Sequence, residues 1–268
     1  MRIGKRGILT AGVLVAGLLL AIPRPDLYQN YHTSQVIYDR QGQLLRLTLS
    51  ADEKYRLRST LNRISPLLVD ATLLYEDRYF YRHHGVNPVA LFKAAWTTYV
   101  LRTQRIGAST ISMQLARLRF RIESHTLGGK LQQILRTLQL EWHYDKDEIL
   151  EAYLNYAPYG GNIEGITSAS LIYFDKLPDK LTLHEALTLA VIPQSPAYRS
   201  LDKGAGNPGL LSARDELIQR WMETHAADSD KLALLKLPVQ ARSRTDLPFL
   251  APHFVEAVLA KNPAQYVT

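Results

Sequence analysis

Residues Leu74–Pro88 read LYEDRYFYRHHGVNP, and the helix that leads into them sets the fold class. A serine followed by a proline, as in Ser65-Pro66, is a common helix start, since serine caps the helix and proline suits its first position. The predicted helix ends near Glu76 and Asp77. This carboxylate pair is either a solvated helix end or a general base at the edge of a cleft. The negative end of the helix dipole and the neighbouring Asp77 would raise the pKa of Glu76, whereas Arg78, Arg82 and His83 would lower it, so this stretch taken alone leaves both interpretations open and favours the solvated helix end.

The composition limits the functions open to the chain. It has 268 residues, of which 46% are hydrophobic and 21% charged, enough for one sizeable core or one domain with appendages. The net charge of +7 and the pI of about 9.5 favour an anionic partner: nucleic acid, anionic lipid or a phosphate-bearing substrate. The absence of cysteine excludes disulfides, cysteine zinc sites and thiol nucleophiles.

The N-terminus predicts a membrane anchor. Residues 1–6, MRIGKR, are basic, and residues 7–23 carry no charge. A stretch of that length is at the short end of the roughly 17–25 residues that span a bilayer. A cleaved signal peptide is the alternative, but LLLAIPRPD offers no small-x-small cleavage site. We therefore predict a cytoplasmic tail over 1–6 and an uncleaved transmembrane signal-anchor over 7–23, with the rest of the chain outside.

The remaining chain is predicted to be mainly α-helical. Residues 24–59 form a connector with a short β-hairpin whose turn is Asp39–Gly42. Residues 60–226 carry helical patterns, with helix starts after Asn87, Ser109, Asp145 and Thr182, and a further helix near residues 212–223. Asp145 with Glu148 resembles a capping box. Residues 227–268 are punctuated by proline and show little helical period, so we interpret them as a linker.

A polar stripe is predicted on the helix that Ser109 would cap. Its members lie at i, i+4, i+7 and i+11: Thr110, Gln114, Arg117 and Arg121. An ordinary solvent-facing surface is the alternative, but such a surface usually mixes in acids. Residues 117–136 contain five cationic side chains and a single acid, Glu123. A cluster of this kind suits a phosphate group.

Other pattern matches predict no site. GAGNPG at 204–209 fits a dinucleotide fingerprint but contains Pro208 and follows no strand. Ser200–Lys203 fits S-x-x-K, but no K-T-G accompanies it. His83 and His84 are adjacent and cannot share one helix face, so no histidine metal centre is predicted.

Four segments together resemble the peptidoglycan glycosyltransferases, glycosyltransferase family 51. EDRYFYRHHG at 76–85 resembles E-D-x-x-F-x-x-H-x-G, and GASTISMQ at 107–114 resembles G-x-S-T-x-x-x-Q. KDEILEAYLN at 146–155 resembles K-x-x-I-L-E-x-Y-L-N, and GGNIEGITSASLIYF at 160–174 resembles a later segment of the family. The resemblance covers residues 50–226. Its details are most similar to class A penicillin-binding proteins of the 1C type, which normally continue into a transpeptidase domain.

The resemblance implies a fold, a reaction and a set of residues. The fold would be lysozyme-like, with a head lobe and a smaller membrane-facing jaw. The enzyme would polymerise lipid II into β-1,4-linked glycan with inversion and release undecaprenyl diphosphate, and Glu76 would be the catalytic base. The substrate-binding positions would be Asp77, Phe80, His83, Gly107, Ser109, Thr110, Gln114, Arg117, Lys130, Gln133 and Asn155.

One motif departs from the family. The third motif is usually R-K-x-x-E, whereas this chain has Gly129, Lys130 and Gln133. Glutamine is a poor cation ligand, so we expect no required cofactor and at most a weak dependence on a divalent cation such as magnesium. Arg136, one helical turn after Gln133, is a candidate source of the lost positive charge.

Two other functions remain open. The departures at Gly129 and Gln133 would suit a weakly active or inactive membrane-anchored scaffold that binds lipid II. A lysozyme-like glycan hydrolase would need a second carboxylate, for which the adjacent Asp77 is poorly placed. The expected location is the bacterial inner membrane with the catalytic domain in the periplasm. The expected partners are lipid II, the growing glycan strand, the bilayer and other cell-wall synthesis proteins, without nucleic acid.

Overall fold

The computed structural model describes residues 23–86 and 109–261. The chain divides into two compact units: residues 1–29 with 80–150 form unit 1, and residues 30–79 with 151–268 form unit 2. The described part is mainly helical with two small sheets, which confirms the mainly α prediction. Among its helices, none is long and apolar enough to cross a membrane. The predicted anchor at 7–23, all but its last residue, and the helix predicted after Asn87 lie outside the described residues.

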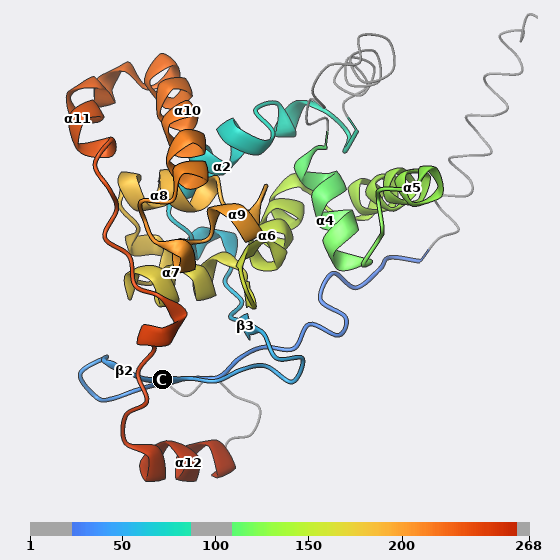
Figure 1. The fold of residues 1–268 in the computed structure, drawn as a ribbon. Coiled ribbons are helices and arrows are strands. Elements are labelled where there is room, and N and C mark those ends of the chain that lie inside the picture. The colour runs from blue at the N-terminus through green and yellow to red at the C-terminus, as the bar shows by residue number, and fades with distance from the viewer. Residues whose placement is uncertain (1–22, 87–108, 262–268) are drawn as a thin grey trace, which may run out of the picture. The chain divides into compact units, whose positions relative to one another are not determined.

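Unit 1 is built on two helices packed against each other, α4 (Ile111–Arg119) and α5 (Leu127–His143) (Figure 1). It also holds the short turn η2 (Phe80–Arg82) and the first residues of α6 (Lys146–Tyr156). The N-terminal segment is tied to α5 through Gln139, whose Nε2 donates to the Pro23 carbonyl at 3.1 Å.

Unit 2 is centred on α2, α8 and α10, which pack on one another. Its elements are β1 (Val36–Tyr38), β2 (Leu44–Leu47), β3 (Tyr55–Arg56), η1 (Leu61–Arg63), α2 (Pro66–Glu76), the rest of α6, β4 (Pro158–Gly160), β5 (Ile163–Glu164), α7 (Ile166–Phe174), η3 (Pro178–Lys180), α8 (Leu183–Ala190), α9 (Pro196–Arg199), η4 (Leu201–Lys203), α10 (Pro208–Thr224), η5 (Ala226–Lys231), α11 (Leu232–Leu235), η6 (Arg244–Asp246) and α12 (Pro252–Lys261).

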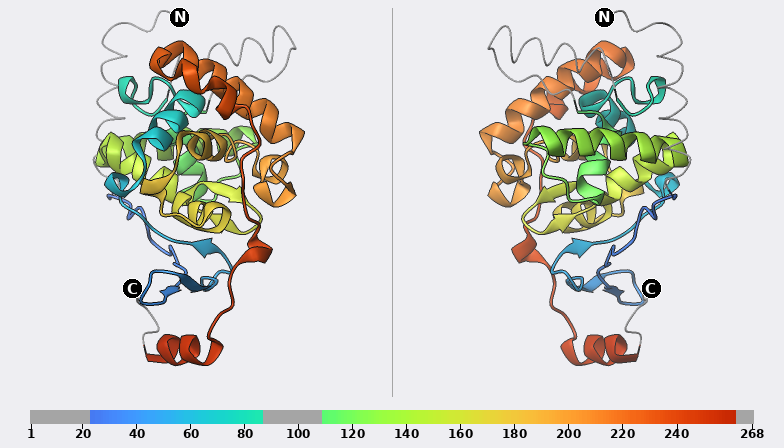
Figure 2. Two further views of the ribbon diagram at one scale, coloured as in Figure 1. Left: turned by 90° about the vertical axis from the view of Figure 1, so that its left-hand side faces the viewer. Right: turned by 90° about the vertical axis from the view of Figure 1, so that its right-hand side faces the viewer.

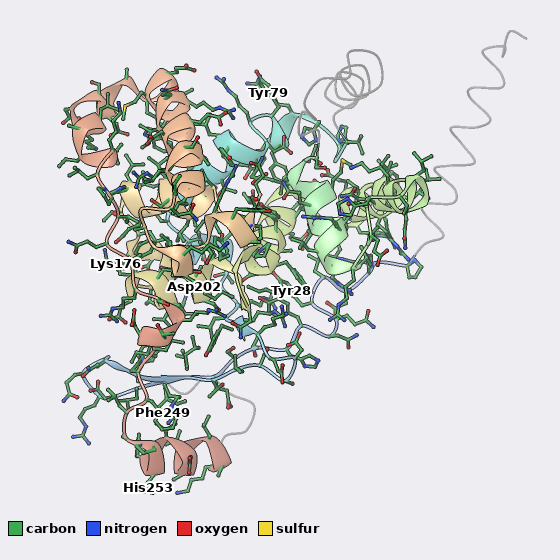
Figure 3. The ribbon with its side chains drawn as sticks, viewed as in Figure 1. Tyr28, Tyr79, Lys176, Asp202, Phe249 and His253 are labelled. Carbon is green, nitrogen blue, oxygen red and sulfur yellow. The ribbon has the colours of Figure 1, made fainter. Side chains whose placement is uncertain are left out.

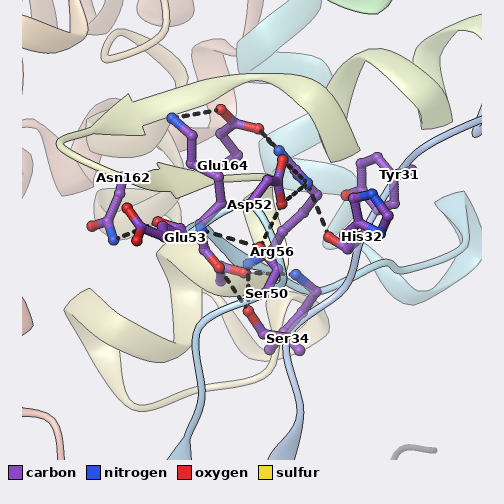
Figure 4. Close-up of polar contacts among 12 residues, drawn as sticks. Tyr31, His32, Ser34, Ser50, Asp52, Glu53, Arg56, Asn162 and Glu164 are labelled. Atoms are coloured by element: carbon purple, nitrogen blue, oxygen red, sulfur yellow. Dashed lines mark hydrogen bonds and ion pairs between the residues drawn. The ribbon is translucent and has the colours of Figure 1, made fainter. Parts of the chain in front are cut away.

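A three-stranded sheet in unit 2 joins the connector to the helical core. β5 pairs in parallel with β3 and antiparallel with β4. Arg56 of β3 is only 5% exposed, and its guanidinium donates to Glu164 and Asp52 and to the His32 carbonyl (Figure 4). A buried arginine is tolerated when charge and hydrogen bonds are both satisfied, as here. The network therefore fixes the connector to the sheet.

The C-terminal segment packs on the predicted hairpin, within unit 2. β1 and β2 pair antiparallel, which confirms the hairpin. Val255 of α12 is fully buried with Ile37 and Leu45 of the hairpin, and Leu259 packs against them. The segment between α11 and α12, which is interrupted by the short helix η6, runs to this small core (Figure 2). Phe249, at the end of that stretch, lies under the Arg46 guanidinium, 3.3 Å from Cζ to the ring centroid (Figure 3).

The sequence predicted the starts of several helices correctly. α2 begins at Pro66, α8 begins after Thr182 with a capping box to Glu185, and Asp145 and Glu148 exchange the two hydrogen bonds of the predicted box at α6. Two details were wrong around α4. Its cap is Thr110 rather than Ser109, and the helix ends at Arg119, so Arg121 is not on the stripe. Arg121 instead has a positive φ of 51°.

The tail was also predicted incorrectly as a region with little helix. Its prolines interrupt the periodic pattern, but Pro252 stands at the start of α12, where proline is compatible with a helix. Val255 and Leu259 are four residues apart and share one face. The helix is therefore held by its contact with the hairpin rather than by a strong pattern of its own.

Candidate functional site

Glu76 is the last residue of α2 in unit 2. The next residue, Asp77, is the C-cap: its N–H donates to the Leu73 carbonyl at 2.9 Å, and its side chain is buried at 9% exposure. Glu76 is half-buried, and one of its carboxylate oxygens, Oε1, is shielded from solvent. The last turn of α2 contains no basic residue. No side chain of α2 itself therefore offsets the negative end of the helix dipole beside Glu76.

The charge of Glu76 contributes to the raised pKa of two tyrosines in unit 2. Burial, and then the negative charge of Glu76, raise the pKa of Tyr159, whose side chain is 1% exposed. Burial is also the main cause of the raised pKa of Tyr75, with Arg199 opposing it and Glu76 adding to it. Glu76 therefore lies within electrostatic reach of buried aromatic groups rather than on an open solvated surface.

Asn155 of α6 is fully buried in unit 2. Its Oδ1 accepts from the Ser59 N–H at 2.9 Å, and its Nδ2 donates to the carbonyls of Ser59 and Glu151 at 2.8 and 2.9 Å. The amide is engaged on both sides, so it holds α6 against the strand leaving β3. The observed contacts are structural, and the substrate contact of Asn155 stays a prediction.

The second half of the EDRYFYRHHG segment packs within unit 1. Phe80 is 1% exposed, and Lys146 lies over its ring with Nζ 4.4 Å from the centroid. Gly85 has a φ of +79°, and a Cβ there would come within 2.6 Å of Glu141 and 2.8 Å of Thr137. Glycine is needed at this position for both reasons. His83 is half-buried, with its ring 6.3 Å from that of Phe80.

Thr110 fixes the start of α4 in unit 1. Its hydroxyl accepts from the Met113 N–H at 3.2 Å and donates to the Gly85 carbonyl, linking the two motifs. Thr110 and Gln114 are 4% and 8% exposed. Both lie inside the unit, whereas Arg117 on the next turn is half-buried. The predicted stripe is thus buried at its start and becomes accessible toward its cationic end.

Lys130 and Gln133 form a polar pair on α5 beside α4. Lys130 Nζ is 2.9 Å from Gln133 Oε1 and 3.4 Å from the Ser109 hydroxyl. Gln133 is 1% exposed, and its Nε2 donates to the Met113 carbonyl at 2.6 Å. Burial, and then the charge of Arg117, lower the pKa of Lys130. A half-buried ammonium with a neutral partner and a second cation nearby is a site that an anion would stabilise.

The comparisons with known proteins place this geometry in a family. The model of a family described as Transglycosylase matches residues 16–223. The chain belongs to the transglycosylase family. This confirms the resemblance drawn from the motifs, and the match begins further toward the N-terminus than residue 50, where the resemblance begins.

This transglycosylase chain is similar to several curated proteins. It is 36% identical over 243 residues to penicillin-binding protein 1C of Escherichia coli, covering 88% of this chain and 30% of that protein. It is 33% identical to E. coli penicillin-binding protein 1A (83% and 26% covered) and 36% identical to Bacillus subtilis penicillin-binding protein 2D (77% and 29%). The chain thus spans less than a third of the length of these relatives. The solved structure of Haemophilus influenzae penicillin-binding protein 1A aligns with a TM-score of 0.45 at 19% identity, covering 87% of this chain and 25% of that one.

The structure explains why this transglycosylase has glycine at position 129. A Cβ at Gly129 would lie 2.0 Å from the Glu123 carbonyl oxygen, whereas Gly128 has nothing within 4 Å. The turn before α5 therefore leaves no room for the arginine of the usual motif. Replacing R-K-x-x-E by G-K-x-x-Q also removes one cation and one anion together, so the formal charge of the motif is unchanged.

The side-chain amide of Gln133 is engaged at both its oxygen and its nitrogen. The only oxygen of its amide faces the Lys130 ammonium at 2.9 Å, where a metal ion would be repelled. Within residues 23–86 and 109–261 there is no group of three histidine or acidic side chains that could hold a metal. Arg136, the candidate for compensating charge, instead donates to Gln139 at 2.7 Å and stacks on Phe120.

The predicted site residues thus fall into three groups. Unit 1 brings together Ser109, Thr110, Lys130 and Gln133, with Arg117 within electrostatic reach of Lys130. Unit 2 contains Glu76, Asp77 and Asn155, and Gly107 lies outside the described residues. Sequence reasoning missed Tyr159, because the three residues of β4 are too few to show a strand period.

Proposed function

We propose that this chain is a peptidoglycan glycosyltransferase that polymerises lipid II. Glu76 would remove the proton from the acceptor sugar hydroxyl, whose oxygen then attacks the anomeric carbon of the donor. The bond to the diphosphate breaks with inversion, a β-1,4 bond forms, and undecaprenyl diphosphate leaves. Lys130 and Arg117 would stabilise the negative charge that develops on the leaving diphosphate.

The observation that carries the proposal is the Lys130 site. Its ammonium is half-buried and hydrogen-bonds a neutral amide, and no carboxylate of the described residues forms an ion pair with it. A hydrolase of finished glycan, which handles no diphosphate, has no need for such a site. A transferase with a diphosphate leaving group does need it. Membership of the transglycosylase family supports the same reaction.

The finer fold and the location are part of the proposal. Two compact units are compatible with a lysozyme-like head lobe and jaw. α5 carries a row of exposed apolar side chains at four-residue spacing, Leu127, Leu131 and Leu135, followed by the exposed Trp142. An apolar row ending in tryptophan suits contact with a membrane interface. It supports a domain held at the periplasmic face of the bacterial inner membrane by the predicted anchor.

The decisive experiment is polymerisation of lipid II by the detergent-solubilised chain, compared with Glu76→Gln. The glutamine variant is isosteric but cannot accept the proton. Glycan product from the parent and at least about a hundredfold less from the variant would support the proposal, since a general base contributes roughly 10²–10⁴-fold. A parent that makes no product but retains lipid II would instead support the scaffold, and cutting of finished glycan would support the hydrolase.

Because the Gln133 amide oxygen faces the Lys130 ammonium, we predict that the enzyme turns over without a metal ion. In metal-free buffer with a chelator the rate of polymerisation should stay within about twofold of the rate in magnesium, because fixed cations replace the metal's charge. A Gln133→Glu variant provides the comparison, since it restores a carboxylate beside Lys130. Loss of parental turnover in chelator with recovery in magnesium would contradict the prediction.

A further inference from the structure

An arginine from α9 is hydrogen-bonded to Tyr75, the residue that precedes Glu76 at the end of α2. Arg199 Nη1 donates to the Tyr75 hydroxyl at 2.7 Å, to Gln194 Oε1 at 2.9 Å and to the Val191 carbonyl at 2.9 Å. Tyr75 in turn donates to Gln194 Oε1 at 2.9 Å. We call Tyr75, Gln194 and Arg199 the clasp. All three residues lie in unit 2, and none belongs to the motifs that carried the family resemblance.

The end of α2 needs such a contact. The last four carbonyls of a helix lack partners within it, so a terminal turn frays unless something holds it. Glu76 is the last helical residue of α2, and the last turn has no basic side chain to offset the dipole. The Arg199 guanidinium supplies that positive charge from another element, and its bond to the end of α8 through Val191 makes the anchor rigid.

We propose that Arg199 and Tyr75 are positioning residues that hold Glu76 in its reactive orientation. This inference rests on the proposed role of Glu76 as the base. Arg199 acts through the Tyr75 hydroxyl: the fixed tyrosine ring fixes the backbone of the last turn, and thereby the side chain one residue later. A general base displaced by about 1 Å loses much of its effect, so loss of this anchor should lower the rate of the chemical step.

Other charged groups near the end of α2 provide controls. Arg220 of α10 lies with Cζ 5.9 Å from the Tyr75 ring centroid but is paired with Glu216 and makes no bond to the hydroxyl. Tyr159 of β4 senses Glu76. On α8, the neighbouring titratable groups are engaged elsewhere, His184 with Arg214 and Glu185 with Lys176.

The test is a set of variants assayed for lipid II polymerisation: Tyr75→Phe, Arg199→Met, Arg199→Lys, the double variant, and Arg220→Met as control. We expect Tyr75→Phe and Arg199→Met each to lower kcat about tenfold with KM unchanged, and the double variant to lose no more than either alone. Arg199→Lys should recover part of kcat, since it keeps the charge but not the fork. Arg220→Met should leave kcat unchanged, and thermal unfolding should show that each variant is folded.

A second readout does not depend on turnover. In protein labelled at the glutamate carboxyl carbon, the NMR signal lost in Glu76→Gln identifies Glu76, and its titration can be followed in each variant. Removal of the Arg199 charge in Arg199→Met should move the midpoint up, and Arg199→Lys, which keeps the charge, should leave it closer to that of the parent.

The outcomes separate the two proposals. Unchanged kcat and an unchanged Glu76 titration in Tyr75→Phe and Arg199→Met, with Glu76→Gln inactive, would overturn the clasp and leave the proposed function standing. Full activity of Glu76→Gln would overturn the function and the clasp together. Equal losses in Arg199→Met and Arg220→Met would show a general charge effect and also overturn the clasp.

Discussion

At the scale of single residues, the two adjacent glycines of α5 give a matched pair. A Cβ at Gly129 would meet the Glu123 carbonyl at 2.0 Å, whereas Gly128 faces open space. Gly129→Ala should therefore lower the free energy of unfolding by about 2 kcal/mol through overpacking. Gly128→Ala should raise it by up to about 1 kcal/mol, as alanine favours a helix. Denaturant unfolding of both variants checks this, and equal effects would contradict the contact.

A histidine in unit 2 should make the folding stability of the protein sensitive to acid. Arg214 is 1% exposed and donates Nη1–H to His184 Nε2 at 3.0 Å, so the imidazole must be neutral there. Burial, and then Arg214, lower the pKa of His184. The folded state thus binds a proton at His184 less well than the unfolded state does. The contribution of His184 to folding stability is therefore fully present above its unfolded pKa of about 6.5, and it is lost as the pH falls through its folded pKa.

The measurement is the unfolding midpoint between pH 7.5 and 5. His184→Gln can still accept from Arg214 but cannot titrate, so its midpoint should fall less with acid than that of the parent. Parallel curves for the two proteins would show that His184 does not carry the effect.

At the scale of elements, the cap of α4 joins two motifs. Thr110 caps α4 through the Met113 N–H and donates to the Gly85 carbonyl. Thr110→Val keeps the shape and removes both bonds, and it should cost about 2 kcal/mol of stability, near the upper range for a cap. Thr110→Ser retains the hydroxyl and should cost much less. Thermal unfolding distinguishes the two, and similar losses would assign the effect to the methyl group.

The elements that sequence predicted are those with local signals. α2, α6 and α8 have a proline or a capping pair at their start, and the hairpin has its turn. α12 has an interrupted pattern, and β3, β4 and β5 are two or three residues long, so tertiary contacts define them. For the same reason, the motifs indicated Glu76 and Lys130, but nothing local pointed to Arg199, which reaches Tyr75 from 124 positions away.

At the scale of the whole molecule, the tail is expected to unfold before the core of unit 2. Its small core consists of Ile37, Leu45, Val255 and Leu259, far less than surrounds α2 and α8. Val255→Asp should release α12 and speed amide exchange in the hairpin, with little change in α2 and α8. Phe254→Asp is the control, since Phe254 is 56% exposed. Equal exchange in the two variants would contradict the packing.

Helix α6 has a consequence for how this chain can be divided. The limit between the units falls at Leu150 and Glu151, in the middle of a continuous helix, where Leu150 and Ala152 are fully buried and Glu151 is half-buried. A cut there would leave two half-helices, each too short to persist alone. The units are therefore not modules that could be expressed separately or exchanged between relatives at that limit. Chimeras should keep residues 146–156 from one parent.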